Sequence, residues 1–578
     1  MLKRLASYLK GYGGYAIASP LLVVLETACE LVLPLLMARI INQGIEGNNM
    51  TVIWQSGALM VAVALVATVV GGYAARCATF AAQGLGANLR RAEFEQIASF
   101  SFADIDRFSS SSLITRLTND LTNIQNVAIM CLRVLIRGVT MTAASVALTL
   151  AISPRLALVV CVVLPFMAAA LGLLMKVCFP LFEKMQKALD HLNETVQENL
   201  VAVRVVKSYV RQDHEREKFK DANDGFTAAG LNAVLRMVAI QPVMMICFSV
   251  ATVLVLYNGG NMVLGGELDI GYLQTVTGYI MQILMSAMMI GMAVLQYTRA
   301  QASIRRVFEV LDAESAITGG GADRLPAPRG RVEFQDVSFR YQTDGAGEDV
   351  LHHIGLTVEP GQFVAIVGGT GTGKSSLVNL IPRFYDVHRG KVLVDGLDVR
   401  DYPLDALRSR IGMVLQNNVL FSGTIRENLL WGNENATQEE LVQAAKDAQA
   451  YDFIMSFPEG FDTYLEQGGV NVSGGQKQRL CIARAMVRKP AILILDDSTS
   501  AVDSATEGRI RQSFRENLKG TTVIIIAQRI SSVQYADKIV VLDEGTVADV
   551  GSHDQLMARS PIYREIYDSQ QEGGSGNG

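Results

Sequence analysis

Six long apolar stretches occupy the first half of the chain, and charged residues are rare within them. Each approaches or exceeds the roughly 20 apolar residues that a helix needs to cross a bilayer. The pattern therefore predicts an all-α bundle of six transmembrane helices. The stretches are residues 15–41, 53–80, 127–152, 156–178, 237–257 and 273–297.

The polar gaps between these stretches alternate between short and long. The short gaps contain Arg155 as their only Lys or Arg, whereas the long gaps contain many. Because Lys and Arg accumulate on cytosolic loops, both long gaps and both termini are predicted to be cytosolic. The short gaps are residues 42–52, 153–155 and 258–272, and the long gaps are residues 81–126 and 179–236.

The long gaps are not expected to be irregular loops. Residues 81–107 and 181–235 have helical periodicity with few Pro or Gly. Because about 20 helical residues extend roughly 30 Å, the membrane helices should continue into the cytosol as long stalks. We expect the stalks to turn near residues 109–120 and 198–209, where a cytosolic domain could act on them.

The second half of the chain has the pattern of an α/β domain. Residues 313–330 are rich in Gly, Pro and Ala, which predicts a linker after a transmembrane domain at residues 1–312. The strand-like segment 331–341 then begins a domain that we expect to cover residues 331–572. The Gly-, Ser- and Asn-rich tail, residues 573–578, is predicted to be disordered.

Composition agrees with a membrane protein and argues against several other classes. Hydrophobic residues make up 50% of the chain and charged residues 19%, which is too apolar for an ordinary cytosolic enzyme. The net charge is −5 with no basic block, so nucleic-acid binding has no electrostatic support. The seven Cys form no CxxC pair and the six His lack metal-ligand spacing, which argues against a disulfide framework or a zinc site.

A phosphate-binding loop is the first motif that carries chemistry. Residues 368–375 match GxxxxGK[ST], after the apolar strand-like segment 363–367 and before a helical segment at 376–381. Lys374 can bring its positive charge close to the β and γ phosphates of ATP, and Ser375 can offer a hydroxyl to Mg²⁺. Backbone N–H groups of the loop can contact phosphate oxygens. The other candidate contacts are Gly368, Thr370, Gly371, Thr372, Gly373 and Ser376.

A second motif complements the loop. Residues 491–495 are purely apolar and lead directly into Asp496. A buried parallel strand can deliver a carboxylate at its C-terminal end, and this is how a Mg²⁺-binding Asp is placed beside a phosphate loop. The two motifs together predict an ATP site with Mg²⁺.

The segment Val472-Ser473-Gly474-Gly475-Gln476 differs from the LSGGQ signature of ABC proteins only at its first residue. With this motif the chain resembles a half-size ABC exporter over nearly its whole length: six membrane helices, then one α/β nucleotide-binding domain. A Ser and two Gly that open a helix form a phosphate-facing N-terminus. The resemblance implies a head-to-tail dimer in which each signature closes the partner's ATP site.

Further roles are implied only by this resemblance. Tyr341 matches the aromatic residue that stacks on adenine, although a Tyr at a strand end could equally serve packing. Gln416 matches the glutamine that touches Mg²⁺ and senses the membrane domain, with a solvent-facing Gln as the alternative. The predicted stalk turns at residues 109–120 and 198–209 resemble the two coupling regions of the family.

The chain departs from the family at two hydrolytic positions. Asp497 stands where the family has Glu, and Gln528 stands where it has His. Asp is one methylene shorter than Glu, and a catalytic group misplaced by about 1 Å can lose on the order of 10²-fold in rate. Gln cannot take up a proton as His does. This chain's own site is therefore predicted to bind ATP and hydrolyse it slowly, while Ser473, Gly475 and Gln476 complete the fast site of a different half-transporter with intact Glu and His. An active homodimer that tolerates both changes is the alternative.

Two features of the membrane stretches bear on transport. Glu26 and Glu30 share one face of the first stretch and could attract cationic substrates, or they could form a structural hydrogen-bonding pair. A methionine stripe in the sixth stretch could line a promiscuous cavity or pack against other helices. The stripe consists of Met281, Met285, Met288 and Met292.

The sequence thus predicts a multi-pass cell-membrane protein with cytosolic termini and a cytosolic nucleotide-binding domain. We expect one subunit of an ATP-driven heterodimeric exporter for small hydrophobic or cationic molecules such as drugs, lipids or peptides. The alternatives are an inward-working transporter of the same fold and an ATP-gated regulatory subunit that does not pump.

Overall fold

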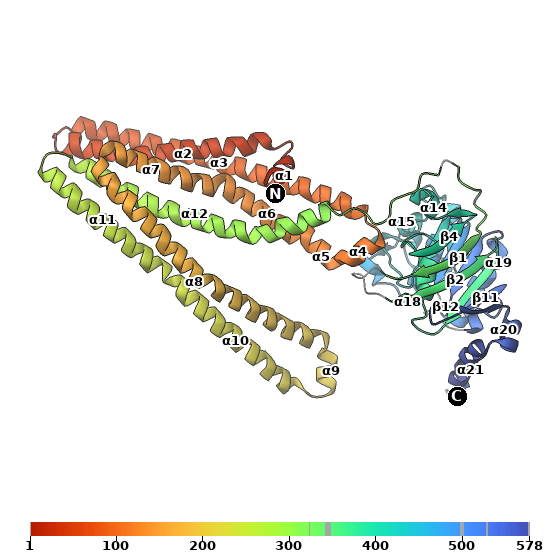
Figure 1. Ribbon diagram of the computed structural model, residues 1–578. Helices are drawn as coiled ribbons and strands as arrows, with labels where there is room; N and C mark the ends of the chain where they lie inside the picture. Colours follow the sequence, from red (N-terminus) through yellow and green to blue (C-terminus); the bar gives the residue numbers. More distant parts are fainter. Residues whose placement is uncertain (1, 323, 342–347, 498–501, 528–529, 576–578) are drawn as a thin grey trace. The chain divides into compact units, whose positions relative to one another are not determined.

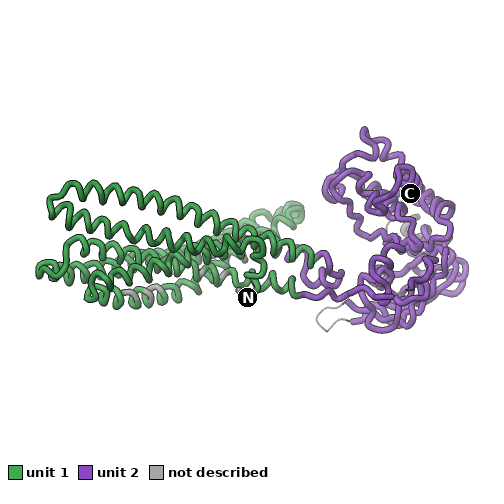
Figure 2. The backbone as a smooth tube through the Cα atoms, turned by 90° about the horizontal axis from the view of Figure 1, so that it is seen from above, with its two compact units in different colours: residues 1–97, 113–312 green, residues 98–112, 313–578 purple. Residues whose placement is uncertain are grey.

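The computed structural model describes residues 2–322, 324–341, 348–497, 502–527 and 530–575. The chain folds into two compact units, which Figure 2 colours separately. The first unit contains residues 1–97 and 113–312, and the second contains residues 98–112 and 313–578. The predicted domain boundaries stay a prediction, but residues 98–112 clearly join the second unit rather than the first.

The first unit consists of helices joined by short turns in the residues described, and it contains six helical segments long and apolar enough to cross a membrane. This confirms the predicted six-helix architecture. Several segments combine α-helix with short π-helical turns. The principal helices are α1 (Leu2–Ser7), α2 (Gly13–Arg39), α3 (Met50–Ala98), α6 (Leu121–Ile129), α7 (Ile136–Ile152), α8 (Pro154–Val201), α9 (Val203–Ser208), α10 (Gln212–Val238), α11 (Ile240–Leu264) and α12 (Ile270–Leu311).

Helices α2, α7 and α12 pack against one another and form the centre of this unit. Helix α10 packs along α8 as a long hairpin whose far end carries α9 (Figure 1). The hairpin begins sharply because Ser153 caps α8 by accepting a hydrogen bond from the Leu156 amide, and Pro154 occupies the first helical position.

The first stalk turn lies earlier than the sequence predicted. Helix α3 ends at Ala98, and a new helix, α4 (Phe102–Phe108), starts at a capping box formed by Ser101 and Asp104. Within residues 109–120, Ser109 forms a second break with φ +56°, and the rest forms α5 (Ser110–Thr115) and the π-helical turn that follows it. The second turn agrees with the prediction, because α9 lies within residues 198–209.

The second unit contains three sheets. A six-stranded sheet has the order β12-β11-β3-β10-β9-β6, and a four-stranded antiparallel sheet has the order β2-β1-β4-β5. The third sheet pairs β7 with β8. The strands are β1 (Val332–Phe339), β2 (Leu351–Val358), β3 (Phe363–Gly368), β4 (Arg389–Val394), β5 (Leu397–Asp398), β6 (Ile411–Val414), β7 (Gly423–Thr424), β8 (Tyr464–Leu465), β9 (Ile492–Asp496), β10 (Thr522–Ile526), β11 (Lys538–Asp543) and β12 (Thr546–Gly551).

Helices complete the second unit. They are α4, α13 (Lys374–Asn379), α14 (Leu404–Ser409), α15 (Ile425–Leu430), α16 (Gln438–Asp447), α17 (Tyr451–Ser456), α18 (Gly474–Val487), α19 (Ser504–Asn517), α20 (His553–Arg559) and α21 (Pro561–Ser575). Helix α21 includes the first three residues of the tail that we predicted to be disordered.

The core of this unit lies on both faces of the six-stranded sheet. Strands β9 and β10 are buried along their whole length, and their residues are apolar except for Asp496 and Thr522, because a parallel sheet is covered on both sides. Strands β11, β3, β10, β9 and β6 run parallel, so their carboxyl ends meet at one edge. That edge is where ligands of open α/β sheets bind.

Candidate nucleotide-binding site

The sheet register places the predicted motifs together. Ile526 at the end of β10 pairs with Ile366 on one side and with Asp496 on the other. On the outer side of β9, Leu495 pairs with Val414 of β6. The phosphate loop, the Asp strand and the segment that carries Gln416 therefore leave the sheet at the same edge.

The phosphate loop has the predicted strand–loop–helix context, between β3 and α13. Gly373 has φ +88°, and a Cβ there would lie 2.7 Å from Leu351 Cδ2, so only glycine fits before the helix. The loop is exposed at Gly369, Thr370 and Gly371, where backbone groups can meet a ligand. Lys374 Nζ donates hydrogen bonds to the carbonyls of Gly368 and Gly369, at 3.0 and 2.5 Å.

Two predicted Mg²⁺ ligands lie side by side. Ser375 Oγ donates a hydrogen bond to Asp496 Oδ1 at 3.0 Å. Burial raises the pKa of Asp496, and the charge of Asp497 raises it further, against the effects of Ser375 and Lys374. A hydroxyl and a buried carboxylate are oxygen donors of the kind that Mg²⁺ prefers, and a cation would stabilise the ionised form. The pair therefore fits Mg²⁺ bound together with phosphate oxygens.

Burial also lowers the pKa of Lys374, while the charges of Asp496 and Asp497 oppose that shift. An anionic ligand beside Lys374 would favour its charged form for the same electrostatic reason. Across the described part of the chain, no group of three or more His, Cys, Asp or Glu could hold a metal ion by itself. A Mg²⁺ site here therefore depends on Ser375, Asp496 and the phosphates of the nucleotide.

Asp497 follows the Mg²⁺ candidate directly and has an unusual backbone. Its φ is +47°, in the left-handed region, and its amide donates to the carbonyl of Ile526 at 3.2 Å. This turn fixes the position from which the side chain of Asp497 leaves the backbone after β9. That side chain is one methylene shorter than the side chain of Glu. Gln528, the second departure, lies outside the residues that the structure describes.

Tyr341 packs among aromatic residues and also adjoins the phosphate loop's helix. Its ring lies edge-on to Tyr385, with centroids 5.1 Å apart, and edge-on to Phe339 at 4.9 Å. Its hydroxyl lies 2.9 Å from Ser376 Oγ on α13, so it adjoins the helix that follows the phosphate loop. The packing role is confirmed, and adenine stacking stays a prediction. Gln416 is exposed just after β6, and its role also stays a prediction.

The signature segment forms the start of α18. Ser473 is the N-cap: its hydroxyl accepts from the Gln476 amide at 3.3 Å, and Gln476 Oε1 accepts from the Ser473 amide at 2.9 Å. Ser473 and Gly474 are exposed, so the N-terminus of a 14-residue helix faces solvent there. Helix N-termini attract anions, which fits the predicted phosphate contact for Ser473, Gly475 and Gln476.

Helix α4 docks within the same unit, beside the aromatic residues near Tyr341. The Phe102 ring lies 4.4 Å from that of Phe384, and the Tyr385 hydroxyl donates to Asp106 Oδ2 at 2.8 Å. Burial, followed by the bond to Asp106, raises the pKa of Tyr385, so the hydroxyl remains a donor. Our sequence analysis missed this contact. Through this contact α4 touches Tyr385. Tyr385 packs against Tyr341, whose hydroxyl lies beside Ser376.

The two membrane carboxylates have a partner that the sequence analysis did not identify. Arg137 on α7 donates to Glu26 Oε1 at 3.0 Å and to Glu30 Oε1 at 2.6 Å. These contacts fit the structural alternative for the two Glu, and attraction of cationic substrates stays a prediction. Arg137 lies inside an apolar stretch, and that position alone was a signal for a paired or functional group.

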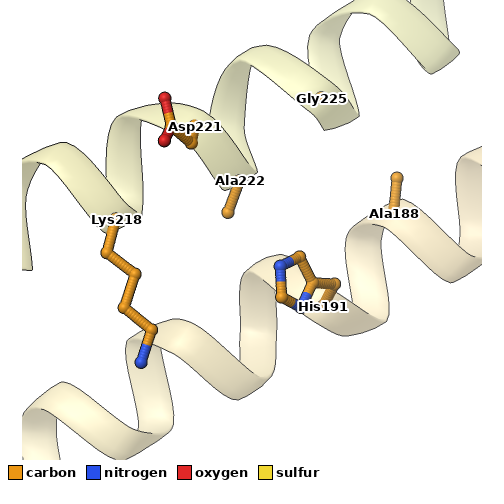
Figure 3. Close-up of a pocket in the computed structure, with 6 residues that line it drawn as sticks. All are labelled: Ala188, His191, Lys218, Asp221, Ala222 and Gly225. Carbon is orange, nitrogen blue, oxygen red and sulfur yellow. The ribbon is translucent and has the colours of Figure 1, made fainter.

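A groove of about 330 Å³ lies between α8 and α10, as Figure 3 shows. Lys218 beside it is already bound to Glu198 at 2.5 Å, and His191 is largely exposed. We assign this groove no part in nucleotide chemistry. Its lining residues are Ala188, His191, Lys218, Asp221, Ala222 and Gly225.

Comparisons with known proteins agree with both halves of this description. Residues 16–288 match the family described as ABC transporter transmembrane region, and residues 351–500 match the family described as ABC transporter. A Bacillus subtilis (strain 168) protein described as uncharacterized ABC transporter ATP-binding protein YfiB is 38% identical over 571 residues, 98% of each chain. Another from the same organism, putative multidrug export ATP-binding/permease protein YgaD, is 33% identical over 589 residues, 99% of each chain. A bacterial Atm1-family ABC exporter solved with ATP bound is 25% identical, with a TM-score of 0.79 over 96% of this chain and 98% of that one.

Proposed function

Since this chain belongs to the ABC transporter family and has the fold of its exporters, we propose that it forms a heterodimer with a different half-transporter. The pair exports hydrophobic or amphipathic molecules, such as drugs, lipids or peptides, across the cell membrane. ATP binding and hydrolysis drive the change from an inward-facing to an outward-facing state. The nucleotide-binding domain and both termini lie in the cytosol.

One observation carries the proposal of unequal ATP sites. The signature Ser473 stands exposed at the start of α18, ready to meet a ligand from outside the chain, whereas the carboxylate after Asp496 is the short Asp497. The chain therefore offers a nearly intact signature and an incomplete hydrolytic set. Heterodimeric assembly uses both: this chain's phosphate loop holds ATP, and its signature completes the partner's fast site.

The far end of the α8–α10 hairpin supports the proposal that a second chain binds there. Val201, Tyr209 and Val210 are each at least 75% exposed there, around α9. Exposed apolar residues that cluster on one protruding segment mark interaction sites. A partner's nucleotide-binding domain would cover them.

Within the chain's own site, each residue has a defined role. The loop at residues 368–375 and Lys374 bind the phosphates, Ser375 and Asp496 would hold Mg²⁺, and Tyr341 supports the adenine. ATP bridges the two subunits only in the closed state, and this difference in contacts lets the nucleotide bias the equilibrium. Tyr385 and Asp106 transmit the closure to the first stalk turn.

The full chain alone provides the first test. Purified in lipid nanodiscs, it should bind Mg-ATP and hydrolyse it slowly. The double variant Asp497→Glu with Gln528→His should hydrolyse ATP on the order of 10²-fold faster, because both hydrolytic groups are restored. Adding Lys374→Ala to the double variant should abolish the gain, which controls for contaminating ATPases. A wild-type rate equal to that of the double variant would rule out a degenerate site.

The second test uses the complex with the partner half-transporter, which would be identified by co-purification with this chain. Ser473→Ala should abolish most of the ATPase activity of the complex, because it damages the partner's fast site. Asp497→Ala should change that activity little. Equal and severe losses from both substitutions would contradict the proposed division of roles.

A further inference from the structure

A cavity of about 170 Å³ lies within the first unit, between α7 and α12. We propose that it binds the uncharged amide group of an amphipathic substrate, with the carbonyl on Arg137 and the N–H on Gln282. This inference deepens the proposed export function and rests on it, since it names the class of molecule carried. The lining residues are Arg137, Met141, Met281, Gln282, Met285, Ser286 and Met289.

Arg137 supplies the hydrogen-bond donor of the site. Its guanidinium is held by Glu26 at 3.0 Å and by Glu30 at 2.6 Å, which uses two of its five N–H groups. The Arg137 side chain keeps 27% of its surface exposed, and it lines the cavity. Its remaining N–H groups can therefore donate to a carbonyl oxygen that enters the cavity.

The charges around Arg137 disfavour an ion of either sign. Among the described lining residues Arg137 is the only charged one, and the two carboxylates lie behind it. The two carboxylates carry one more charge than Arg137 but do not line the cavity, so the Coulomb attraction and repulsion that an ion would feel there oppose each other. An ion would lose its hydration without a net Coulomb gain, whereas a neutral carbonyl loses less and still receives a charge-assisted hydrogen bond.

Gln282 supplies the acceptor. Its Oε1 atom is buried and has no hydrogen-bond partner in the described part of the chain. Ser286, on the same wall, is already engaged, because its hydroxyl donates to the Ile283 carbonyl at 2.8 Å and lies 2.6 Å from Thr142 Oγ1. A ligand that pairs with Gln282 must bring an N–H or O–H donor, and the Gln282 amide must turn toward the cavity because its Oε1 atom is buried.

The volume of the cavity and its apolar lining residues limit the size and character of the rest of the ligand. At roughly 30 Å³ for each water, the cavity has the volume of about six water molecules, enough for an amide group and a few carbons. Met281 and Met285 are each at least 40% exposed, so they extend an apolar surface beyond the cavity. Methionine side chains adapt to varied apolar shapes, which suits the hydrocarbon part of the substrate.

Three probes of equal chain length test this assignment: dodecanamide, dodecanoate and dodecyltrimethylammonium. Each is titrated onto the full chain in lipid nanodiscs, in competition with a fluorescent acyl amide and with correction for partition into protein-free nanodiscs. Dodecanamide should bind at least tenfold more tightly than either ion, a difference of about 1.4 kcal/mol. ATP binding is measured in the same samples.

Two variants remove one polar contact each. Gln282→Leu should weaken dodecanamide binding about tenfold, and the triple variant Arg137→Met, Glu26→Gln and Glu30→Gln should do the same without leaving an uncompensated charge. Gln241→Leu, an exposed membrane-helix position, is the matched control and should leave binding unchanged.

Tighter binding of either ion, or equal dodecanamide binding by wild type and Gln282→Leu, would overturn the assignment. The ATP measurement separates this inference from the proposed function. Failure of the wild-type chain to bind ATP contradicts the export proposal, whereas intact ATP binding without amide preference contradicts only the substrate class.

Discussion

Replacing Arg137 by Met should destabilise the first unit strongly, because it leaves two carboxylates without their cation. The Glu26 side chain is 8% exposed and the Glu30 side chain 24%, and both bind the same guanidinium. Removing one partner of a buried ion pair costs about 3–5 kcal/mol. Since Glu30 and Arg137 keep about a quarter of their surface exposed, we expect the lower end, about 3 kcal/mol.

The assay is thermal unfolding in nanodiscs, followed by Trp54 fluorescence in a Trp431→Phe background so that the signal arises from the first unit. At about 2 °C per kcal/mol for a unit of this size, Arg137→Met should lower the midpoint by about 6 °C. Adding Glu26→Gln and Glu30→Gln should restore most of the loss. Arg133→Met is the matched control, because Arg133 forms no ion pair among the described residues and lies one turn earlier on the same segment.

A midpoint that falls by less than about 2 °C for Arg137→Met would refute the reasoning. So would a triple variant that is as unstable as Arg137→Met alone, because the loss would then not come from uncompensated carboxylates. Equal losses for Arg133→Met and Arg137→Met would point to a general effect of removing arginine from this helix.

Three further changes test other parts of the structure. Tyr385→Phe removes the hydrogen bond between the half-buried Tyr385 and the exposed Asp106, and it should cost at most about 1 kcal/mol of stability. In the two-chain complex it should lower substrate-stimulated ATPase activity more than basal activity, and equal loss of both activities would contradict a coupling role. Gly71→Ala would place a Cβ 2.6 Å from Glu26 Oε1, so it should lower the thermal midpoint, and the added substitution Glu26→Ala should relieve the clash. Chelating Mg²⁺ with EDTA should weaken ATP binding to wild type, whereas Asp496→Asn should make binding nearly insensitive to EDTA; unchanged sensitivity in Asp496→Asn would show that Asp496 does not hold the ion.

Local sequence patterns were sufficient for most of the fold. Length and apolarity identified the six membrane helices, and the loop at residues 368–375 followed by the strand before Asp496 identified the nucleotide-binding edge. Both signals are local, because each lies within continuous segments of the sequence. The first stalk turn was misplaced because helical periodicity continues past Ala98, and the decisive signal was the short capping box at Ser101 and Asp104.

Contacts between distant segments could not be predicted in the same way. Arg137 lies 111 and 107 residues from Glu26 and Glu30, and no local pattern joins them. Tyr385 and Asp106 are 279 residues apart, so only the folded second unit brings them together. The sequence showed which groups needed partners, whereas the tertiary structure decided which partners they found.

Helix α4 has a consequence for how the protein is made. It belongs to the second unit, but Phe102 is translated about 280 residues before Phe384, on which it packs. At roughly 5–20 residues per second, a ribosome needs about 15–55 s to cover that distance. During this interval the aromatic surface that receives Phe102 does not exist, so the first part of the unit to be synthesised waits for later segments before it reaches its native surroundings.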